Sequence, residues 1–171
     1  MTVYSLGHST RDFDQFLAML TANGIEELVD IRSLPGSRRY PWFDREALAA
    51  SLPAAGIGYR HAPALGGRRR GSAASVNTGW HHPAFRAYAD YMQTPQFATA
   101  LEELIRSADA RQLAIMCSEA VPWRCHRRLV TDALLARGVP VLDLIGRRPR
   151  PATMTPFAVA GPTITYPEPH G

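Results

Sequence analysis

Apolar positions recur along this chain with two different spacings. Short apolar runs, typical of buried strands, lie at 3–6, 28–32, 59–62, 113–116 and 139–145. Between them, apolar side chains recur every three or four residues, as on the buried face of an amphipathic helix. These helical segments lie at 13–20, 45–55, 83–92, 95–107 and 122–135. Strands that alternate with helices predict an α/β fold with a mainly parallel sheet.

Residues at the boundaries of these segments fit the same prediction. Ser9 and Asp12 have capping-box spacing ahead of the first helical segment, which Asn23-Gly24 would end. Asp44 and Thr94 stand at the N-cap positions of two later helices. We therefore expect a single α/β domain over 1–146, with about five strands flanked by helices in a Rossmann-like layering.

Two parts of the chain lack such a pattern. Residues 63–82 show no period, and a loop of this length in a compact domain is usually functional or disordered. Residues 147–171 form a Pro-rich C-terminal tail that can pack on the domain, and 163–166 could add an edge strand. The chain contains no internal repeat.

Composition places the chain among soluble globular proteins. Of its 171 residues, 46% are hydrophobic and 20% are charged. No segment approaches the roughly 20 apolar residues that a membrane span needs, so we expect no membrane contact. The N-terminus begins directly with a strand-like run and lacks the features of a secretory leader, which favours a cytoplasmic location. Two cysteines in such a protein are expected to be free, catalytic or metal-bound.

The positive charge of this protein comes from arginine alone. The net charge is +4, and the sequence contains no lysine. Codon bias would explain this usage, and so would an anionic partner, because guanidinium groups bind carboxylate and phosphate well. Arginines cluster at 38–39, 68–70 and 127–128, with Tyr40, Trp42 and Trp80 near two of the clusters. Aromatic rings beside arginines can stack nucleotides, although a solvated basic surface would look the same.

Reactive side chains are densest between 113 and 135. The apolar run 113–116 predicts a strand with Cys117 at its carboxyl end. Pro122 is typical of the first position of a helix. This helix would carry Arg124, Cys125 and His126 in its first turns, with Arg127 and Arg128 after them. A thiol that faces a helix N-terminus is stabilised as the thiolate.

Topology gathers further candidates around Cys117. Ligands of parallel α/β sheets bind beyond the carboxyl ends of the strands, where residues from separate strands meet. The candidate catalytic residues are Cys117, Glu119 and His8. The candidate substrate-binding or anion-binding residues are Arg32, Arg124, Arg38, Arg39 and Asp30. Glu119 would act as a general acid or base if its carboxylate turns toward the cleft.

Other interpretations of the same residues remain open. Cys117 could simply be a small buried residue, and Cys125 and His126 lie on apolar helical rows that would face the core. A metal site could join Cys117, Cys125 and His126, with His8 as a fourth ligand, although the spacing matches none of the usual short zinc pairs. The two cysteines could also form a redox pair if their Cα atoms come within about 7 Å.

Several motifs in a fixed order resemble a known bacterial family. They are Gly7-His8-Ser9, Asp30-Ile31-Arg32 with Pro35 and Ser37-Arg38-Arg39, Leu65-Gly66-Gly67, the segment 85–92, and Cys117-x-Glu119 followed by Pro122-Trp123-Arg124-Cys125-His126-Arg127. Together they resemble the domain of unknown function 488 family over residues 3–145. The family has no established activity, and some members carry a label that connects them with DNA repair. The resemblance therefore supports the fold and these positions without naming a reaction.

Two functions fit these observations. The first is a cysteine-dependent enzyme that acts on an anionic substrate, such as a nucleotide or nucleic acid, at the carboxyl edge of the sheet. The alternative is a non-catalytic module that binds nucleic acid or a protein partner, has structural cysteines, and is associated with DNA repair. The sequence indicates neither a cofactor nor an oligomeric state.

Overall fold

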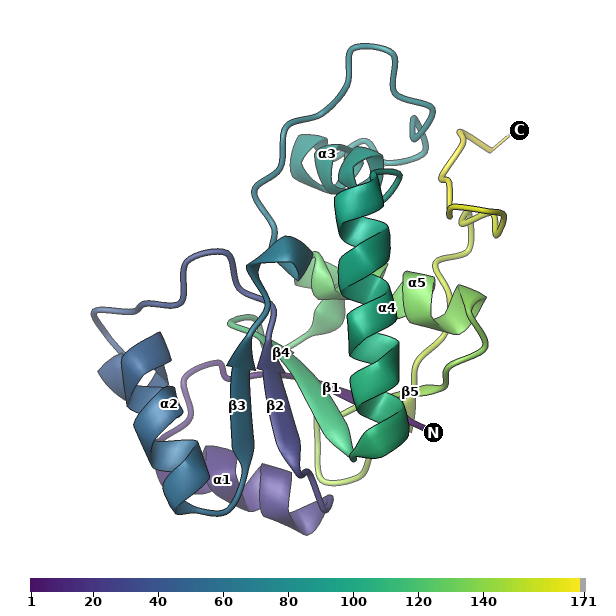
Figure 1. The fold of residues 1–171 in the computed structure, drawn as a ribbon. Coiled ribbons are helices and arrows are strands. Elements are labelled where there is room, and N and C mark those ends of the chain that lie inside the picture. Colours follow the sequence, from purple (N-terminus) through teal and green to yellow (C-terminus); the bar gives the residue numbers. More distant parts are fainter. Residues whose placement is uncertain (170–171) are drawn as a thin grey trace.

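Residues 1–169 are described by the structure, a computed structural model, and they form a six-stranded sheet between two layers of helices (Figure 1). The strands are β1 (Val3–Gly7), β2 (Glu27–Asp30), β3 (Gly58–His61), β4 (Leu113–Cys117), β5 (Val141–Asp143) and β6 (Arg150–Pro151). The α-helices are α1 (Phe13–Ala22), α2 (Arg45–Ala54), α3 (Pro83–Tyr91), α4 (Pro95–Ala110) and α5 (Arg127–Ala136). Three short 3-10 turns are η1 (Pro41–Phe43), η2 (Pro63–Leu65) and η3 (Pro122–Arg124).

The strand order across the sheet is β3-β2-β4-β1-β5-β6. The first five strands run parallel to their neighbours, and only β6 is antiparallel to its neighbour β5. The predicted α/β fold with a mainly parallel sheet is thereby confirmed. The sixth strand comes from the Pro-rich segment, where two residues are too few to leave a pattern in the sequence.

Helices cover both faces of the sheet (Figure 1). On one face α1 and α2 pack against Leu6, Leu28 and Met116. On the other face α3, α4 and α5 pack against Val29 and Ile115. Because β4 is covered on both faces, all five of its residues are buried, which explains why the strand is apolar throughout. This arrangement leaves the carboxyl edge of the sheet as the place where loops and polar side chains collect.

The first helix begins at Phe13, as its apolar spacing predicts, but its cap differs from the expected one. Asp12, and not Ser9, is its N-cap: the Asp12 carboxylate accepts the backbone N–H of Gln15 at 2.7 Å, and the Gln15 side chain accepts the N–H of Asp12 at 3.1 Å. The physical reason is that the chain still follows the sheet at Ser9, whose N–H donates to the carbonyl of Ser118 at 3.0 Å.

The prediction of one helix from Pro122 onward is wrong. Residues Pro122–Arg124 form the 3-10 turn η3, Cys125 is extended (φ −145°, ψ 153°), and α5 begins only at Arg127. Pro122 favours helical dihedrals, but the extended residue Cys125 ends the helix after a single turn. Cys125 and His126 therefore precede the helix, and their side chains are not on its core-facing rows.

The boundaries of the last segments also differ from expectation. β5 is three residues long, and the edge strand expected at 163–166 is reduced to a single antiparallel bridge between Val159 and Thr165. The segment after β6 instead lies against α5: the buried Tyr166 hydroxyl donates to Asp132 Oδ2 at 2.8 Å, and the N–H of Thr155 donates to Asp132 Oδ1 at 2.8 Å. Within residues 1–169, no helix is long and apolar enough to cross a membrane.

Candidate functional site

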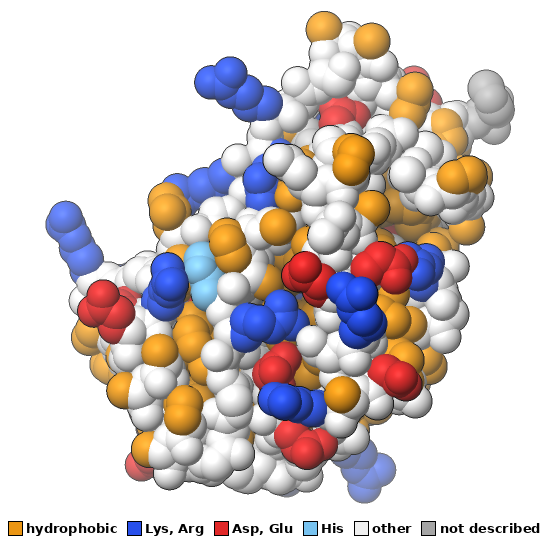
Figure 2. Space-filling view, viewed as in Figure 1, with side chains coloured by type: hydrophobic (Ala, Val, Ile, Leu, Met, Phe, Trp, Pro, Cys, Tyr) orange, Lys and Arg blue, Asp and Glu red, His pale blue; other side chains and the backbone are white. Residues whose placement is uncertain are grey.

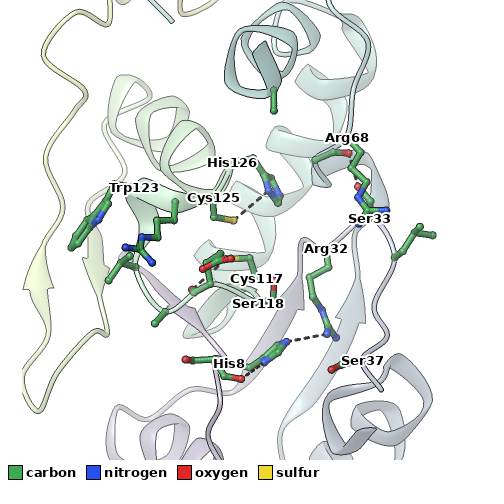
Figure 3. Close-up of a pocket in the computed structure, with 18 of the residues that line it drawn as sticks. His8, Arg32, Ser33, Ser37, Arg68, Cys117, Ser118, Trp123, Cys125 and His126 are labelled. Carbon is green, nitrogen blue, oxygen red and sulfur yellow. Dashed lines mark hydrogen bonds between the residues drawn. The ribbon is translucent and has the colours of Figure 1, made fainter. Parts of the chain in front are cut away.

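A cleft of about 980 Å³ opens at the carboxyl edge of the sheet. Its floor is formed by residues that follow three strands: His8 after β1, Arg32 after β2, and Cys117 at the end of β4 (Figure 3). Its walls come from the loop that contains Arg68 and from the segment before α5. This is the position at which parallel α/β sheets bind ligands.

Cys117 lies at the bottom of this cleft beside a fully buried arginine. The Arg127 guanidinium donates from Nε to Cys117 Sγ at 3.2 Å and from Nη1 to the Ser5 hydroxyl at 2.7 Å. Its Nη2 donates to the carbonyl of Glu119 at 2.9 Å. The side chain is 0% exposed. The sequence suggested that Arg127 belongs to a basic surface. The structure shows instead that its side chain is buried and that its charge is directed at the thiol.

The environment of Cys117 favours the thiolate. Burial by itself raises the pKa of this thiol, but a hydrogen bond from Cys125 and the charge and hydrogen bond of Arg127 outweigh that effect and lower the pKa to about 7. Near neutral pH, a large fraction of Cys117 is then ionised. The thiol of Cys125 shows the opposite shift, because its hydrogen bond to Cys117, its burial and the charge on Cys117 all raise its pKa.

His126 is held in one tautomer at the side of the cleft. Its Nε2 lies 2.8 Å from the carbonyl of Ile31, which can only accept, so Nε2 carries the proton. The Nδ1 atom is then an acceptor, and it lies 3.4 Å from Cys125 Sγ. Burial and the nearby charge of Arg127 lower the pKa of His126 to about 4, so the ring is neutral.

His8 and Arg32 form a second buried pair on the other side of Cys117. Arg32 Nη1 lies 3.3 Å from His8 Nε2, so that nitrogen accepts and the Nδ1–H donates to the Ser9 carbonyl at 2.9 Å. The His8 ring stacks on Phe43 at 4.4 Å between centroids. Burial lowers the pKa of His8, with a smaller effect of the Arg32 charge in the same direction. His8 and His126 are therefore neutral at pH 7.

Asp30 fixes the orientation of the Arg32 side chain. Its carboxylate accepts from Arg32 Nε at 2.9 Å and Nη2 at 2.8 Å, and from the Tyr59 hydroxyl at 2.6 Å. Asp30 is completely buried and does not line the cleft. It orients the guanidinium so that Nη1 points toward His8 and the cleft (Figure 3).

The rim of the cleft combines charge with exposed apolar side chains. Arg68, Arg124 and Glu119 are exposed there, and Trp123 and Leu34 keep 54% and 73% of their surface accessible. Three arginines and one glutamate line the cleft, so its charge is positive. The predicted residues Arg38 and Arg39 are exposed on the neighbouring loop and do not line it.

Three features of the site were not predicted from the sequence. The pairing of Arg127 with Cys117 depends on burial, which is rare for arginine. The role of His126 depends on the extended residue before α5. The close approach of the loop at Gly67 is the third, because a Cβ on Gly67 would lie 3.1 Å from His126 Nδ1. The Leu65-Gly66-Gly67 motif is the signal that could have pointed to a tight backbone approach.

The cysteines and histidines do not assemble into a metal site. Cys125 and His126 already contact each other, and His126 Nε2 is occupied by the Ile31 carbonyl. Among residues 1–169, no group of three His, Cys, Asp or Glu side chains could hold a metal ion.

Comparison with known proteins assigns the chain to a family. The sequence model of a family described as "Domain of unknown function DUF488" matches residues 12–134. The chain belongs to this family. The matched DUF488 region includes Arg32, Cys117 and α5 as far as Leu134, whereas His8 lies just before it. No curated protein and no solved structure matches the chain.

Proposed function

We propose that this DUF488 protein is an enzyme that uses the Cys117 thiolate on an anionic substrate bound in the cleft. The observation that carries the proposal is the contact between Cys117 Sγ and the buried Arg127 guanidinium at 3.2 Å. A buried guanidinium needs a compensating negative charge. Within residues 1–169, no carboxylate lies in ion-pair distance of Arg127. The Cys117 thiolate supplies that charge and is at the same time a strong nucleophile.

The charges around the cleft favour an anionic substrate. Arg32 Nη1 faces the cleft from a fixed position, and Arg68 and Arg124 add charge at the rim. Guanidinium groups bind carboxylate and phosphate with two parallel hydrogen bonds. The exposed ring of Trp123 offers a stacking surface for a flat group such as a nucleobase. A nucleotide or another anion with a planar part fits this combination.

The remaining residues have distinct roles in this proposal. Arg32 binds the anion, and His8 accepts from its Nη1 and fixes its orientation. Glu119 is exposed at the rim, where its carboxylate can exchange protons with solvent and with a bound substrate. Burial lowers the pKa values of His8 and His126, so both rings are weak bases, and Glu119 is the exposed group that can carry a proton from the cleft to solvent.

Alkylation with two reagents of different charge tests the proposal. Iodoacetamide is neutral and iodoacetate is anionic, and both label a thiolate. We expect both reagents to label Cys117 in the folded protein near pH 7. The ratio of the iodoacetate rate to the iodoacetamide rate should be higher in the folded protein than in the urea-unfolded chain. Peptide mass spectrometry reads the two cysteines separately, because trypsin cleaves between them after Arg124.

A pair of arginine variants serves as the control. Arg124→Gln removes a charge from the rim and should lower the iodoacetate preference by about fivefold, the size expected for one screened charge nearby. Arg39→Gln removes an exposed arginine outside the lining and should leave the preference unchanged. The proposal is wrong if Cys117 resists both reagents in the folded protein, or if folding does not change the preference.

One observation favours the alternative of a binding module. Arg38, Arg39, Arg68 and Arg70 are exposed on the two loops beside the cleft, and basic side chains project from this end of the molecule in Figure 2. Such a surface would bind nucleic acid mainly through phosphates, so affinity would fall steeply with salt. Binding that persists in Cys117→Ser and is lost when these four arginines become glutamine would support this second function.

A further inference from the structure

Two thiols, and not one, meet at the buried arginine. Arg127 donates its side-chain Nε to Cys117 Sγ at 3.2 Å and its backbone N–H to Cys125 Sγ at 3.4 Å. Each thiol also shifts the pKa of the other, lowering that of Cys117 and raising that of Cys125. Both are free, and both line the same cleft (Figure 3). A function that needs only one thiolate leaves the second cysteine unexplained.

Cys125 has its own proton acceptor. The Nε2–H of His126 is engaged with the Ile31 carbonyl, which leaves Nδ1 as a lone-pair acceptor 3.4 Å from Cys125 Sγ. Gly67 keeps this nitrogen accessible, since a Cβ there would lie 3.1 Å from it. The cleft therefore contains one thiolate that is ready to attack and one thiol beside a base.

We propose that Cys117 and Cys125 are a dithiol pair that reduces an anionic organic disulfide, with Cys117 as the attacking and Cys125 as the resolving cysteine. This inference rests on the proposed function and deepens it, because it names the substrate class and gives the second cysteine a role. The arginines that line the cleft select the negative charge of the substrate.

The reaction balances without another reactant. The Cys117 thiolate attacks one sulfur of the substrate RS–SR′, forming a mixed disulfide Cys117–S–SR and releasing R′S⁻. Cys125 then attacks Cys117 Sγ, which forms the Cys117–Cys125 disulfide and releases RS⁻. The proton of Cys125 leaves through His126 Nδ1 to one of the released thiolates. The substrate disulfide is reduced by two electrons, and the protein dithiol is oxidised by two electrons.

Arg127 explains why the two cysteines act in this order. While Cys117 is ionised, its charge and its hydrogen bond raise the pKa of Cys125 and keep it protonated. When Cys117 enters the mixed disulfide, that negative charge disappears and the charge of Arg127 is left without a partner. The guanidinium then favours the thiolate of Cys125. The same arginine thus activates first the attacking and then the resolving thiol.

The test uses the full-length reduced protein and oxidised glutathione, a disulfide with several carboxylates. Tryptic digestion without reductant separates the peptide 112–124, which contains Cys117, from the tripeptide 125–127, which contains Cys125. We expect these two peptides to become disulfide-linked in the wild-type protein, with two molecules of reduced glutathione released. Cystamine, a cationic disulfide, should react at least tenfold more slowly.

Three variants resolve the steps. Cys125→Ser should stop at a glutathione adduct on Cys117, and Cys117→Ser should give no adduct under the same conditions. His126→Gln keeps an N–H donor for the Ile31 carbonyl but lacks the Nδ1 acceptor, so it should form the adduct normally and resolve it severalfold more slowly. Circular dichroism verifies that each variant is folded. The disulfide-linked peptides are measured in the wild-type protein, so that result does not depend on the folding of any variant.

Each result has a distinct meaning. If Cys117 forms the adduct but the linked peptides never appear, the dithiol inference fails while the proposed thiolate function stands. If neither cysteine reacts in the folded protein, both fail. If cystamine reacts as fast as oxidised glutathione, or if only hydrogen peroxide links the peptides, the anionic disulfide is the wrong substrate class and the inference is overturned.

Discussion

Arg127 is the residue on which the chemistry of the cleft depends most. Its guanidinium is fully buried, contacts Cys117 Sγ and Ser5 Oγ, and fixes the loop after β4 through the Glu119 carbonyl. Asp143 is a carboxyl group that senses this charge: burial raises its pKa, and the Arg127 charge lowers it. The Cys117 thiol is the acidic group in direct contact with the guanidinium.

Replacing Arg127 tests this electrostatic coupling directly. In Arg127→Met, the burial that raises the Cys117 pKa remains and the charge and hydrogen bond of Arg127 are lost, so the pKa should rise from about 7. Iodoacetamide labelling of Cys117 between pH 5 and 10 measures the shift. Arg128→Met is the matched control, because Arg128 contacts Thr155 and Trp80 and not the thiol. An unchanged pH midpoint in Arg127→Met would contradict the assigned role.

Single residues also mark the limit of prediction from the sequence. A strand end and the following proline indicated that Cys117 lies at the carboxyl edge, because apolar periodicity and topology are local and regular signals. Arg127 could not be identified, since its burial results from the packing of β1, β4 and α5 together. Similarly, no pattern reveals that the adjacent Arg128 is half-exposed while Arg127 is inaccessible.

At the scale of elements, the close approach of β1 to the loop after β4 shapes the floor of the cleft. A Cβ on Gly7 would lie 1.5 Å from the Glu119 carbonyl oxygen and 3.0 Å from the Ala120 nitrogen. The same carbonyl accepts the hydrogen bond of Arg127 Nη2. Only glycine allows this backbone contact, which explains why the first strand ends in Gly7.

Gly7→Ala should therefore damage both stability and the site. Relief of the overlap requires the backbone to move, and we expect a loss of about 3 kcal/mol or more in the free energy of unfolding. Movement of Glu119 should also release Arg127 and slow Cys117 labelling at pH 7. Urea unfolding and alkylation measure the two effects. Gly146→Ala is the control, because nothing lies within 4 Å of a Cβ at that position; equal behaviour of the two variants would refute the argument.

The elements themselves were largely predictable, and the exceptions have physical causes. Four-residue and five-residue strands and helices with caps leave regular apolar patterns, so the alternation and the parallel sheet follow from the sequence. The helix expected from Pro122 fails at Cys125, which is extended. The two residues after it are held by distant partners, His126 by the Ile31 carbonyl and Arg127 by the Ser5 hydroxyl. Because those contacts are tertiary, helix propensity gave the wrong start.

At the scale of the whole molecule, the C-terminal segment is connected to the helix that carries Arg127. Asp132 of α5 is fully buried and accepts from Tyr166 Oη and the Thr155 backbone at 2.8 Å each. Asn77 connects the loop before α3 to the C-terminal segment as well, since its Oδ1 accepts the N–H of Tyr166 at 2.9 Å. Three distant parts of the chain therefore depend on one another.

Tyr166→Phe should weaken this connection. The substitution leaves Asp132 Oδ2 without its donor, and a buried hydrogen bond to a charged group contributes about 1.5–3 kcal/mol. We expect a decrease of that size in the free energy of unfolding, together with faster tryptic cleavage in the arginine-rich stretch 147–150. Tyr4→Phe is the comparison, because the half-buried Tyr4 hydroxyl makes no hydrogen bond within residues 1–169. A Tyr166→Phe protein as stable and as resistant as Tyr4→Phe would exclude this role.

His8 and His126, which are neutral in the cleft, should contribute to how the whole protein responds to acid. Burial lowers the pKa of His126 to about 4 and also lowers that of His8, against an ordinary value of 6.5. Between the folded and unfolded pKa values, only the unfolded chain binds the proton, so stability increases with pH there. Stability should consequently be complete above about pH 6.5 and decrease as the pH falls toward 4.

His126→Gln separates this contribution from the others. The shift of His126 corresponds to a loss of roughly 3 kcal/mol between pH 6.5 and 4, at about 1.4 kcal/mol for each pH unit. Glutamine keeps the donor to the Ile31 carbonyl but does not titrate, so the variant should lose less stability over this range while His8 still contributes. Urea unfolding at four pH values from 4.5 to 7.5 gives both profiles. Parallel profiles for the wild type and the variant would mean that His126 is not held neutral by its burial beside Arg127.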